Sequence, residues 1–280
     1  MKNIQYKGFV LSLQKDELRR KNFYQQVSSL DSNHIQFETF YAIDAKKDED
    51  KAYIDEHFDF AKAKKLYGRD VSYGEAACSL SHIKIYEQAL SQQSYLIVCE
   101  DDAKFNKDFP KLERILKQSD FDIIIFGESK APSFKGSRKY RLAYPLQFKP
   151  YRFENYKLGC IYGFYTPGTV GYAINVNALK YIIQLVQKTK VYWLADDFQE
   201  IINQVNDEYN YKISIAHLFP RLVIEDLSIQ SHLETERVQL QKQIANNNLS
   251  LFAYLKHNIS LLKAYLKKRH IAYNDARKTK

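Results

Sequence analysis

Three consecutive acidic residues form the stretch of this sequence best suited to chemistry. Glu100, Asp101 and Asp102 directly follow an apolar run, residues 95–99, which has the length of a buried strand. In open α/β sheets ligands bind at the carboxyl ends of the strands, where these acids would emerge. Crowded carboxylates repel one another unless a cation lies among them or some of them face water. The triplet therefore indicates either a site for Mg²⁺ or Mn²⁺ with substrate phosphates, or a solvated acidic turn.

A second pair of acids, Asp196 and Asp197, stands at the start of a helix predicted to run to about Val205. The partial positive charge at a helix N-terminus favours acidic residues, so capping is a sufficient explanation for at least one of them. The pair lies close to Trp193, the single tryptophan of the chain. A second role for one of the two carboxylates stays open.

Two further residues carry groups suited to binding. Asp44 ends the apolar run 35–43, where a carboxylate could accept hydrogen bonds from ribose or base groups. As a single acid, Asp44 is more simply explained as a turn residue. His82 shares one face of a predicted helix with Glu75 and Tyr86. The pattern leaves His82 either as a member of a polar site or as a hydrogen-bonded surface histidine.

The elements that must position these residues alternate between strands and helices. Strands are predicted at residues 4–13, 35–43, 95–99, 121–126, 172–176 and 213–218. Helices are predicted at residues 18–30, from a capping box at 72–75 to about 90, at 104–117, after Asn177 and from 196 to about 205. This order predicts an α/β fold with a mostly parallel sheet and helices on both sides.

Two segments break this rhythm. Residues 46–70 are charged and low in apolar content, which predicts a surface excursion. Residues 128–170 mix basic and aromatic side chains without clear periodicity. A long irregular segment inside a compact domain usually forms a lid or a binding loop, and this one suits a sugar face and an anionic acceptor. The alternative is a loose surface insertion without function.

The charge of the chain is unevenly distributed. The 280 residues are 45% hydrophobic, which is typical of a folded protein, and the net charge is +9. Residues 251–280 hold eight basic residues and one acid, whereas a groove for nucleic acid would spread its charge over the domain. Leucine and isoleucine recur every three or four residues in this tail. The tail is therefore predicted as a basic amphipathic helix that lies on a membrane surface or packs on the core.

Cysteine usage and hydropathy indicate a cytoplasmic protein. Cys78, Cys99 and Cys160 are an odd number without close pairing, which fits a reducing compartment. The apolar run 9–13 is too short for the core of a signal peptide. No stretch approaches the roughly 20 apolar residues that span a bilayer.

Several motifs occur in a fixed order over roughly residues 5–232. They are residues 9–13 with Arg19 and Arg20, residues 42–44, residues 73–82, residues 100–103, residues 168–172 and residues 195–198. In this order they resemble glycosyltransferase family 25, which includes bacterial lipooligosaccharide glycosyltransferases and collagen galactosyltransferases. The block Gly74–His82 followed by the acidic triplet is the specific part of the resemblance.

The resemblance implies a GT-A fold, a Rossmann-like α/β domain, which is assigned to residues 1–232. The basic helical tail, predicted from its own pattern, is assigned to residues 233–280. The resemblance also implies an inverting transfer from a nucleotide-diphosphate sugar. The acidic triplet would replace the family's Asp-x-Asp motif, so Mn²⁺ or Mg²⁺ is assigned chiefly to Asp102, with Asp101 and the late His232 as further ligands. The residues implied around the donor are Ser12, Arg19, Asp44, Ser81, His82, Glu100, Asp101, Gly168 and Thr169.

The expected reaction moves a hexose, most commonly galactose, from a UDP-sugar to a lipooligosaccharide, a lipopolysaccharide or another glycan. Asp196 or Asp197 would accept the proton of the acceptor hydroxyl, and Asp196 matches the family's aspartate more closely. The tail would hold the enzyme on the anionic inner face of the membrane, and nucleic acid is not an expected partner. Two alternatives stay open: a membrane-surface or nucleic-acid binding module, and a metal-dependent phosphoesterase that uses the same acids.

Overall fold

A computed structural model describes residues 6–30, 35–91, 94–136, 151–160 and 168–229, together with residues 231 and 233. The chain divides into two compact units, Met1–Gln230 and Ser231–Lys280. All the elements below belong to the first unit. The basic helix predicted in the tail lies outside the described residues. Among the helices that are described, none has the length and apolar character needed to cross a lipid bilayer.

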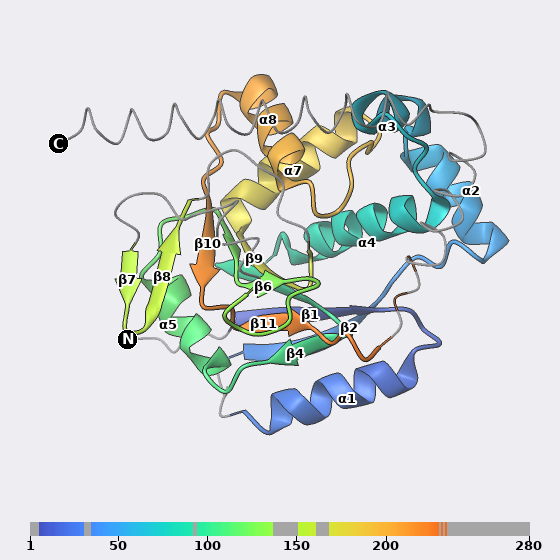
Figure 1. The fold of residues 1–280 in the computed structure, drawn as a ribbon. Helices are drawn as coiled ribbons and strands as arrows, with labels where there is room; N and C mark the ends of the chain where they lie inside the picture. The colour runs from blue at the N-terminus through green and yellow to red at the C-terminus, as the bar shows by residue number, and fades with distance from the viewer. Residues whose placement is uncertain are drawn as a thin grey trace, which may run out of the picture. The chain divides into compact units, whose positions relative to one another are not determined.

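An eight-stranded sheet runs through the first unit (Figure 1). In spatial order its strands are β2 (Ile35–Tyr41), β1 (Tyr6–Ser12), β3 (Tyr95–Glu100), β9 (Gly171–Asn175), β5 (Ile123–Ile125), β10 (Ile215–Phe219), β8 (Tyr156–Gly159) and β7 (Tyr151–Phe153). Strands β9 and β8 run against the direction that β1, β2, β3, β5 and β10 share. The predicted mostly parallel sheet is confirmed, and the reversed direction of β9 has no counterpart in the prediction.

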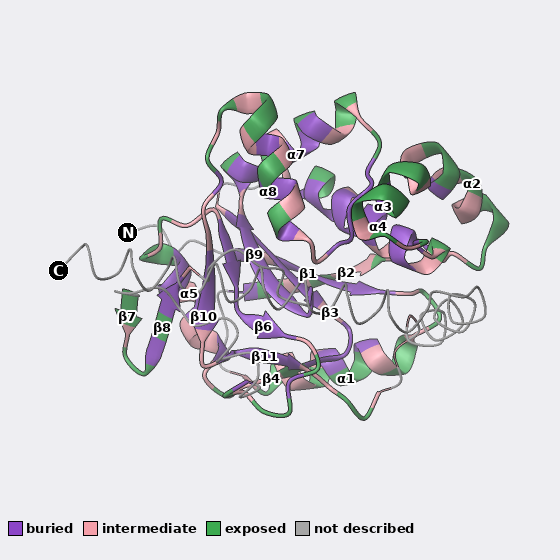
Figure 2. Ribbon diagram, turned by 45° about the horizontal axis from the view of Figure 1, so that its top comes forward, coloured by how far each residue is buried: buried purple, intermediate pink, exposed green. Residues whose placement is uncertain are grey.

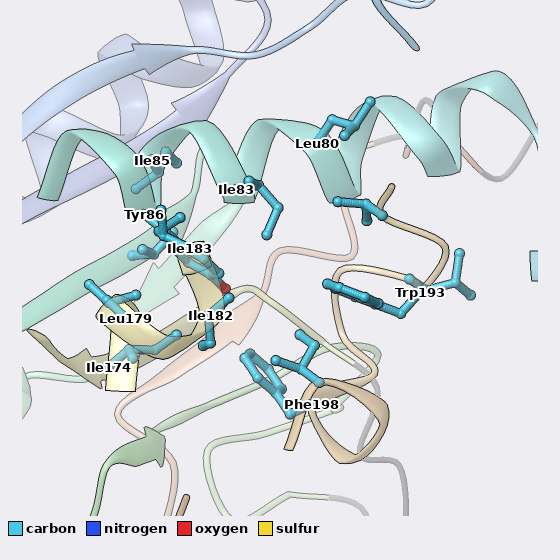
Figure 3. Packing of buried hydrophobic residues seen from close by; sticks show 14 of the residues in the cluster. Leu80, Ile83, Ile85, Tyr86, Ile174, Leu179, Ile182, Ile183, Trp193 and Phe198 are labelled. Atoms are coloured by element: carbon cyan, nitrogen blue, oxygen red, sulfur yellow. The ribbon is translucent and has the colours of Figure 1, made fainter. Parts of the chain in front are cut away.

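Helices cover both faces of the sheet, as two hydrophobic clusters show. One face carries α2 (Asp48–His57), α3 (Phe60–Tyr67), α4 (Tyr73–Ala89), α7 (Val176–Lys188) and α8 (Phe198–Tyr209), and the other carries α1 (Glu17–Ser28) and α5 (Leu112–Lys117). In Figure 2 the central strands are buried and much of α2 is exposed. Figure 3 shows the first cluster, where Ile83 of α4 faces Ile182 and Ile183 of α7.

The strand before the acidic triplet is buried on both faces. Leu96, Ile97, Val98 and Cys99 are each 0% exposed, because β3 lies between β1 and β9 and helices cover the sheet on both sides. Successive side chains of β3 alternate between the two hydrophobic clusters. This environment explains why the sequence of β3 is a continuous apolar run rather than an alternating pattern.

The structure corrects two predicted segments. Residues 46–70 form helices α2 and α3, and each buries a residue completely, Ile54 and Ala63 respectively. The predicted helix at 104–117 begins instead as strand β4 (Ala103–Phe105), continues as a 3₁₀ turn (Phe109–Lys111) and becomes α-helical only in α5. Strand β4 belongs to a separate three-stranded sheet, with β11 (Val223–Glu225) and β6 (Gly127–Glu128). Because β4 pairs with β11, which lies far along the chain, the residues around β4 show no local pattern that predicts this strand.

Helix α4 is fixed at its start by the predicted capping box. The N–H of Glu75 donates to Ser72 Oγ at 3.1 Å, and the N–H of Ser72 donates to Glu75 Oε2 at 3.1 Å. The guanidinium of Arg69 donates to both Glu75 oxygens, at 2.8 and 2.7 Å. Helix α4 is buried on more than its predicted core stripe, and His82 is only 1% exposed. The alternative of a surface histidine is therefore wrong.

Candidate active site

The register of three strands brings the predicted site residues to one edge of the sheet. Leu11 of β1 pairs with Glu100 of β3, and Cys99 of β3 pairs with Gly171 of β9. Strand β9 is antiparallel to β3, so it begins where β1 and β3 end. The turn at residues 168–170 consequently lies beside the acidic triplet.

Ser12 and Arg19 hold the two aspartates of the triplet. Ser12 Oγ donates to Asp101 Oδ2 at 2.5 Å. Arg19 Nε lies 3.2 Å from Asp101 Oδ1, and Arg19 Nη2 donates to Asp102 Oδ2 at 2.8 Å. Arg19 belongs to the first turn of α1, so a cation of the protein itself lies among the carboxylates. Both carboxylate oxygens of Asp101 therefore contact Ser12 or Arg19, whereas only one carboxylate oxygen of Asp102 contacts Arg19.

The second oxygen of Asp102 is buried without a hydrogen-bond partner among the described residues. Burial raises the pKa of Asp102 to about 7, with Asp101 and Glu225 adding to the rise and Arg19 opposing it. Burial, and next the charge of Asp102, raises the pKa of Glu100 to about 8. One guanidinium does not neutralise this cluster. A hard cation at Asp102 Oδ1 therefore fits the residues present.

Glu225 joins the acids although no sequence signal identifies it. The antiparallel pairing of β11 with β4 sets Glu225 opposite Ala103, directly after the triplet. The N–H of Asp226 donates to the carbonyl of Asp102 at 2.8 Å. Glu225 Oε2 accepts a hydrogen bond from the N–H of Lys130 at 2.8 Å. In the sequence, Glu225 is distinguished only as an acid that follows a short apolar run. This pattern is too common to identify a functional site.

The turn before β9 supplies Thr169, whose hydroxyl donates to Glu100 Oε1. Gly168 has a φ of 121°, a backbone conformation that residues with a side chain rarely adopt. A Cβ at this position would also lie 2.8 Å from the backbone nitrogen of Ser129. A glycine is thus required for the turn that brings Thr169 onto Glu100. Contacts of Gly168 and Thr169 with a donor remain predictions.

Helix α4 buries His82 against β9. His82 Nδ1 lies 2.5 Å from Tyr172 Oη, which in turn lies 3.0 Å from Tyr86 Oη. His82 Nε2 has no hydrogen-bond partner within the described part of the chain. Burial lowers the pKa of His82 to about 3, so its imidazole is neutral. The tyrosine pair therefore fixes the ring and leaves Nε2 available to a ligand.

The acid pair at the start of α8 separates into a helix cap and a second carboxylate. Asp197 is the N-cap: its Oδ1 accepts from the N–H of Glu200 at 3.1 Å, and its Oδ2 accepts from the Tyr67 hydroxyl at 2.8 Å. Asp196 is partly exposed and is not the cap. The ring of Phe198 packs 5.1 Å from that of Tyr172, so α8 begins close to the His82 side of the site.

Asp44 lines a cavity of about 400 Å³ at the carboxyl ends of β1 and β2. Asp44 Oδ2 accepts a hydrogen bond from Lys15 Nζ at 3.2 Å. Arg20, which the motif contains without an assigned role, fixes the loop that carries Lys15. Its guanidinium donates to Ser12 Oγ at 3.0 Å and to the carbonyl of Gln14 at 2.7 Å. Arg20 thereby connects the wall of the cavity to the residue that holds Asp101.

The hydroxyl of Ser81 makes two hydrogen bonds within the protein. Its Oγ accepts from the N–H of Ile43 at 2.9 Å and donates to the carbonyl of Ala77 at 2.7 Å, and the residue is 0% exposed. Ser81 therefore ties α4 to the segment that carries Asp44. These two hydrogen bonds position the segment that carries Asp44 against α4. Direct contact between Ser81 and a donor stays a prediction.

Part of the predicted site falls in segments that are not described. His232, predicted as a metal ligand, lies outside the described residues. Residues 137–150 and 161–167 of the predicted lid do so as well. The described part of the candidate site therefore consists of the sheet edge and the starts of α1, α4 and α8.

Comparisons with known proteins identify the family. The family model described as "Glycosyltransferase family 25 (LPS biosynthesis protein)" matches residues 5–199. A Haemophilus influenzae protein named "Putative glycosyltransferase" is 25% identical over 233 residues, which are 81% of this chain and 72% of that protein.

Similar solved structures include a glycosyltransferase involved in the glycosylation of the major capsid of PBCV-1, with 10% identity, a TM-score of 0.35 and coverage of 82% of this chain and 96% of that one. Another is the inositol-1-phosphate CTP transferase from T. maritima, with 11% identity, a TM-score of 0.40 and coverage of 83% and 94%. Because the family model spans well over half of its residues, the chain belongs to glycosyltransferase family 25.

Proposed function

We propose that this glycosyltransferase transfers a hexose, with galactose as the leading candidate, from a UDP-sugar to a lipooligosaccharide, a lipopolysaccharide or a related glycan, with inversion at the anomeric carbon. The observation that carries the proposal is the buried Oδ1 of Asp102, which has no hydrogen-bond partner among the described residues, at the sheet edge where β1 and β3 end. A nucleotide diphosphate with its divalent cation supplies what this carboxylate lacks.

The nucleoside end of the donor fits the cavity beside Asp44. A volume of about 400 Å³ lies within the range of small-molecule sites. The Asp44 carboxylate can accept hydrogen bonds from ribose or base, and Lys15 can face the diphosphate. The loop that carries Lys15 leads to Ser12 and Arg19. This path supports a donor that extends from the cavity towards the triplet.

Asp102 would hold Mn²⁺ or Mg²⁺, with Glu225, whose charge acts on Asp102, as a further candidate ligand. Asp101 is a weaker candidate because both its oxygens are already bound by Ser12 and Arg19. A bound divalent ion would supply a positive charge for the phosphate oxygens of the leaving group. Arg19, with its side chain against both aspartates, contributes a second fixed positive charge at the same edge.

Asp196 is our candidate for the catalytic base. The acceptor hydroxyl would give its proton to this carboxylate while its oxygen attacks the anomeric carbon and the bond from that carbon to the diphosphate breaks. Asp197 is less suitable, because its oxygens accept hydrogen bonds from the Glu200 N–H and from Tyr67. This division of roles supports the preference for Asp196 that the family resemblance implies.

The acceptor and the location of the enzyme are further parts of the proposal. The basic and aromatic composition of residues 128–170 supports an anionic glycan acceptor. The excess of basic residues in 251–280 supports peripheral binding to the cytoplasmic face of the inner membrane, at on the order of 1 kcal/mol for each basic residue near an anionic surface.

A screen of UDP-sugars tests the reaction. Full-length protein is incubated with each sugar nucleotide, with and without Mn²⁺ and with and without lipooligosaccharide, and both UDP release and acceptor mass are measured. We expect UDP release that depends on Mn²⁺, together with an acceptor heavier by one hexose. Free sugar with no extended acceptor would instead indicate hydrolysis, as expected of a phosphoesterase, and would contradict the proposal.

A further inference from the structure

We propose that Cys78, His82 and Glu100 form a second cation site, separate from Asp102, that binds Zn²⁺ or a similar borderline-soft metal ion. One ligand atom from each residue, the Cys78 sulfur, a ring nitrogen of His82 and a carboxylate oxygen of Glu100, lies within 4.8 Å of the others. The described part of the chain contains no other such group of three histidine, cysteine or acidic side chains.

Two rigid elements build this group. Cys78 and His82 are four residues apart on α4, so their side chains lie on the same face of the helix, one turn apart. Glu100 is the last residue of β3, the strand with both faces covered. The capping box and the bidentate Arg69 fix the start of α4 only a few residues before Cys78. The three ligands are thus carried by a helix and a strand rather than by mobile loops.

The surroundings orient two of the ligands. Tyr172 Oη lies 2.5 Å from His82 Nδ1 and 3.0 Å from Tyr86 Oη, and the buried Nε2 of His82 has no hydrogen-bond partner in the part of the chain that the structure describes. The Thr169 hydroxyl donates to one oxygen of Glu100. Metal-binding histidines and carboxylates are typically held by such hydrogen bonds on the side away from the ion. An unsatisfied nitrogen on a histidine that is 1% exposed is the second, independent indication of a ligand.

The ligand set selects the type of ion. A thiolate, an imidazole and a carboxylate together suit Zn²⁺, whereas the oxygen ligands at Asp102 suit Mg²⁺ or Mn²⁺. With Zn–S near 2.3 Å and Zn–N near 2.1 Å, tetrahedral ligand atoms lie about 3.6 Å apart. In the structure the three ligand atoms lie within 4.8 Å of one another. Zinc binding therefore requires them to move closer together by up to roughly 1 Å. Cys78 and Glu100 are partly exposed, which gives the ion a path from solvent and leaves a fourth position for water.

Cobalt binding provides a test that does not depend on catalysis. The reduced, chelator-treated full-length protein is titrated with Co²⁺, and the thiolate-to-cobalt charge-transfer band is recorded in the near ultraviolet. We expect one equivalent of Co²⁺ to produce the band and Zn²⁺ to abolish it. Cys78→Ser should lose the band, while the matched variant Cys160→Ser and the variant Asp102→Asn should keep it. No band in the unmodified protein, or a band that survives in Cys78→Ser, overturns the proposal.

Protection of the Cys78 thiol from alkylation by bound Zn²⁺ gives a second test. It uses the unmodified protein, so the result does not depend on whether a variant folds. Zn²⁺ should slow alkylation of Cys78 at least tenfold while leaving the alkylation rate of Cys160 unchanged, as measured by peptide mass spectrometry. Equal protection of both cysteines, or protection of neither, contradicts the site. A failed sugar-transfer assay would not affect either measurement, so the two proposals can fail separately.

Discussion

Two acidic regions of this molecule differ in how their charge is compensated. At the sheet edge, the guanidinium of Arg19 binds Asp101 and Asp102, while the charges of Asp101 and Glu225 raise the pKa of Asp102. One buried oxygen of Asp102 has no hydrogen-bond partner among the described residues. At the start of α8, Asp197 satisfies both its oxygens with a backbone N–H and a tyrosine hydroxyl.

The difference separates a carboxylate that stabilises the fold from one that needs a ligand. Asp197 contributes to helix α8 as a cap, and its contacts explain why an acid stands there. Nothing in the described residues compensates Asp102 in the same way. Uncompensated, buried acids with a raised pKa are typical of functional sites, because a structural role does not require that cost.

The largest effect is expected from Asp102→Asn. Loss of the cation's charge on the leaving diphosphate removes several kcal/mol of transition-state stabilisation, so turnover should fall about 1,000-fold. Stability should be unchanged or slightly higher, since the amide carries no charge to bury. Steady-state UDP release measures the loss, with Asp197→Asn as the matched control at the other acidic region. Near-normal turnover that still needs Mn²⁺ would remove Asp102 from the site.

A smaller loss is expected from Asp196→Asn. General-base catalysis contributes about 100-fold or more, so turnover should fall about 100-fold while the KM for the donor stays constant. Asp197→Asn should keep most of the activity, because asparagine is as good an N-cap as aspartate. If both variants keep near-normal turnover with unchanged donor binding, neither carboxylate is the base.

Stability should depend on pH chiefly through the sheet edge. Burial also raises the pKa of Asp197 at the α8 cap, which adds a dependence of the same sign. The pKa values of Asp102 and Glu100 are raised from 3.8 and 4.5 to about 7 and about 8, so the folded protein binds more protons than the unfolded chain in this interval. Their stabilising contribution is complete below about pH 4 and is lost as the pH rises to about 8.

Melting temperatures of wild type and Asp102→Asn in metal-free buffer test whether stability decreases as the pH rises. The melting temperature of wild type relative to the variant should decrease as the pH increases through that interval, and Mn²⁺ should reduce the decrease. A difference that is constant with pH would show that Asp102 is ionised in the folded protein at all these values.

The smallest effect is expected from Asp197→Ala, which removes the cap of α8. The free energy of unfolding, measured by urea titration, should fall by about 1 kcal/mol, whereas Asp197→Asn should cost little. Turnover per folded molecule should remain close to normal. A loss of turnover without a loss of stability would mean that Asp197, rather than Asp196, takes the proton.

Features fixed by nearby residues could be predicted from the sequence. The apolar run 95–99 specified β3 and the position of the triplet, and Ser72 with Glu75 specified the start of α4. The α/β fold with a mostly parallel sheet followed from the order of the predicted strands and helices, and the observed sheet confirms it. The family resemblance followed from motifs in their order, and the family match confirms it.

Features that depend on distant segments could not be predicted in this way. The reversed β9 brings Thr169 to Glu100, and the pairing of β11 with β4 brings Glu225 beside the triplet. The position of Arg19 between two aspartates also requires α1 and β3 to be placed first. Helices α2 and α3 escaped prediction because each buries so few residues that charged positions dominate its pattern.

Calorimetric titration of UDP into the protein measures whether Asp102 binds the cation that accompanies the donor. If Asp102 holds the cation that binds the donor diphosphate, Mn²⁺ should tighten UDP binding to wild type at least tenfold and should have no effect on Asp102→Asn. UDP binding of equal strength with and without Mn²⁺ in wild type, or an undiminished Mn²⁺ effect in Asp102→Asn, would rule out this role for Asp102.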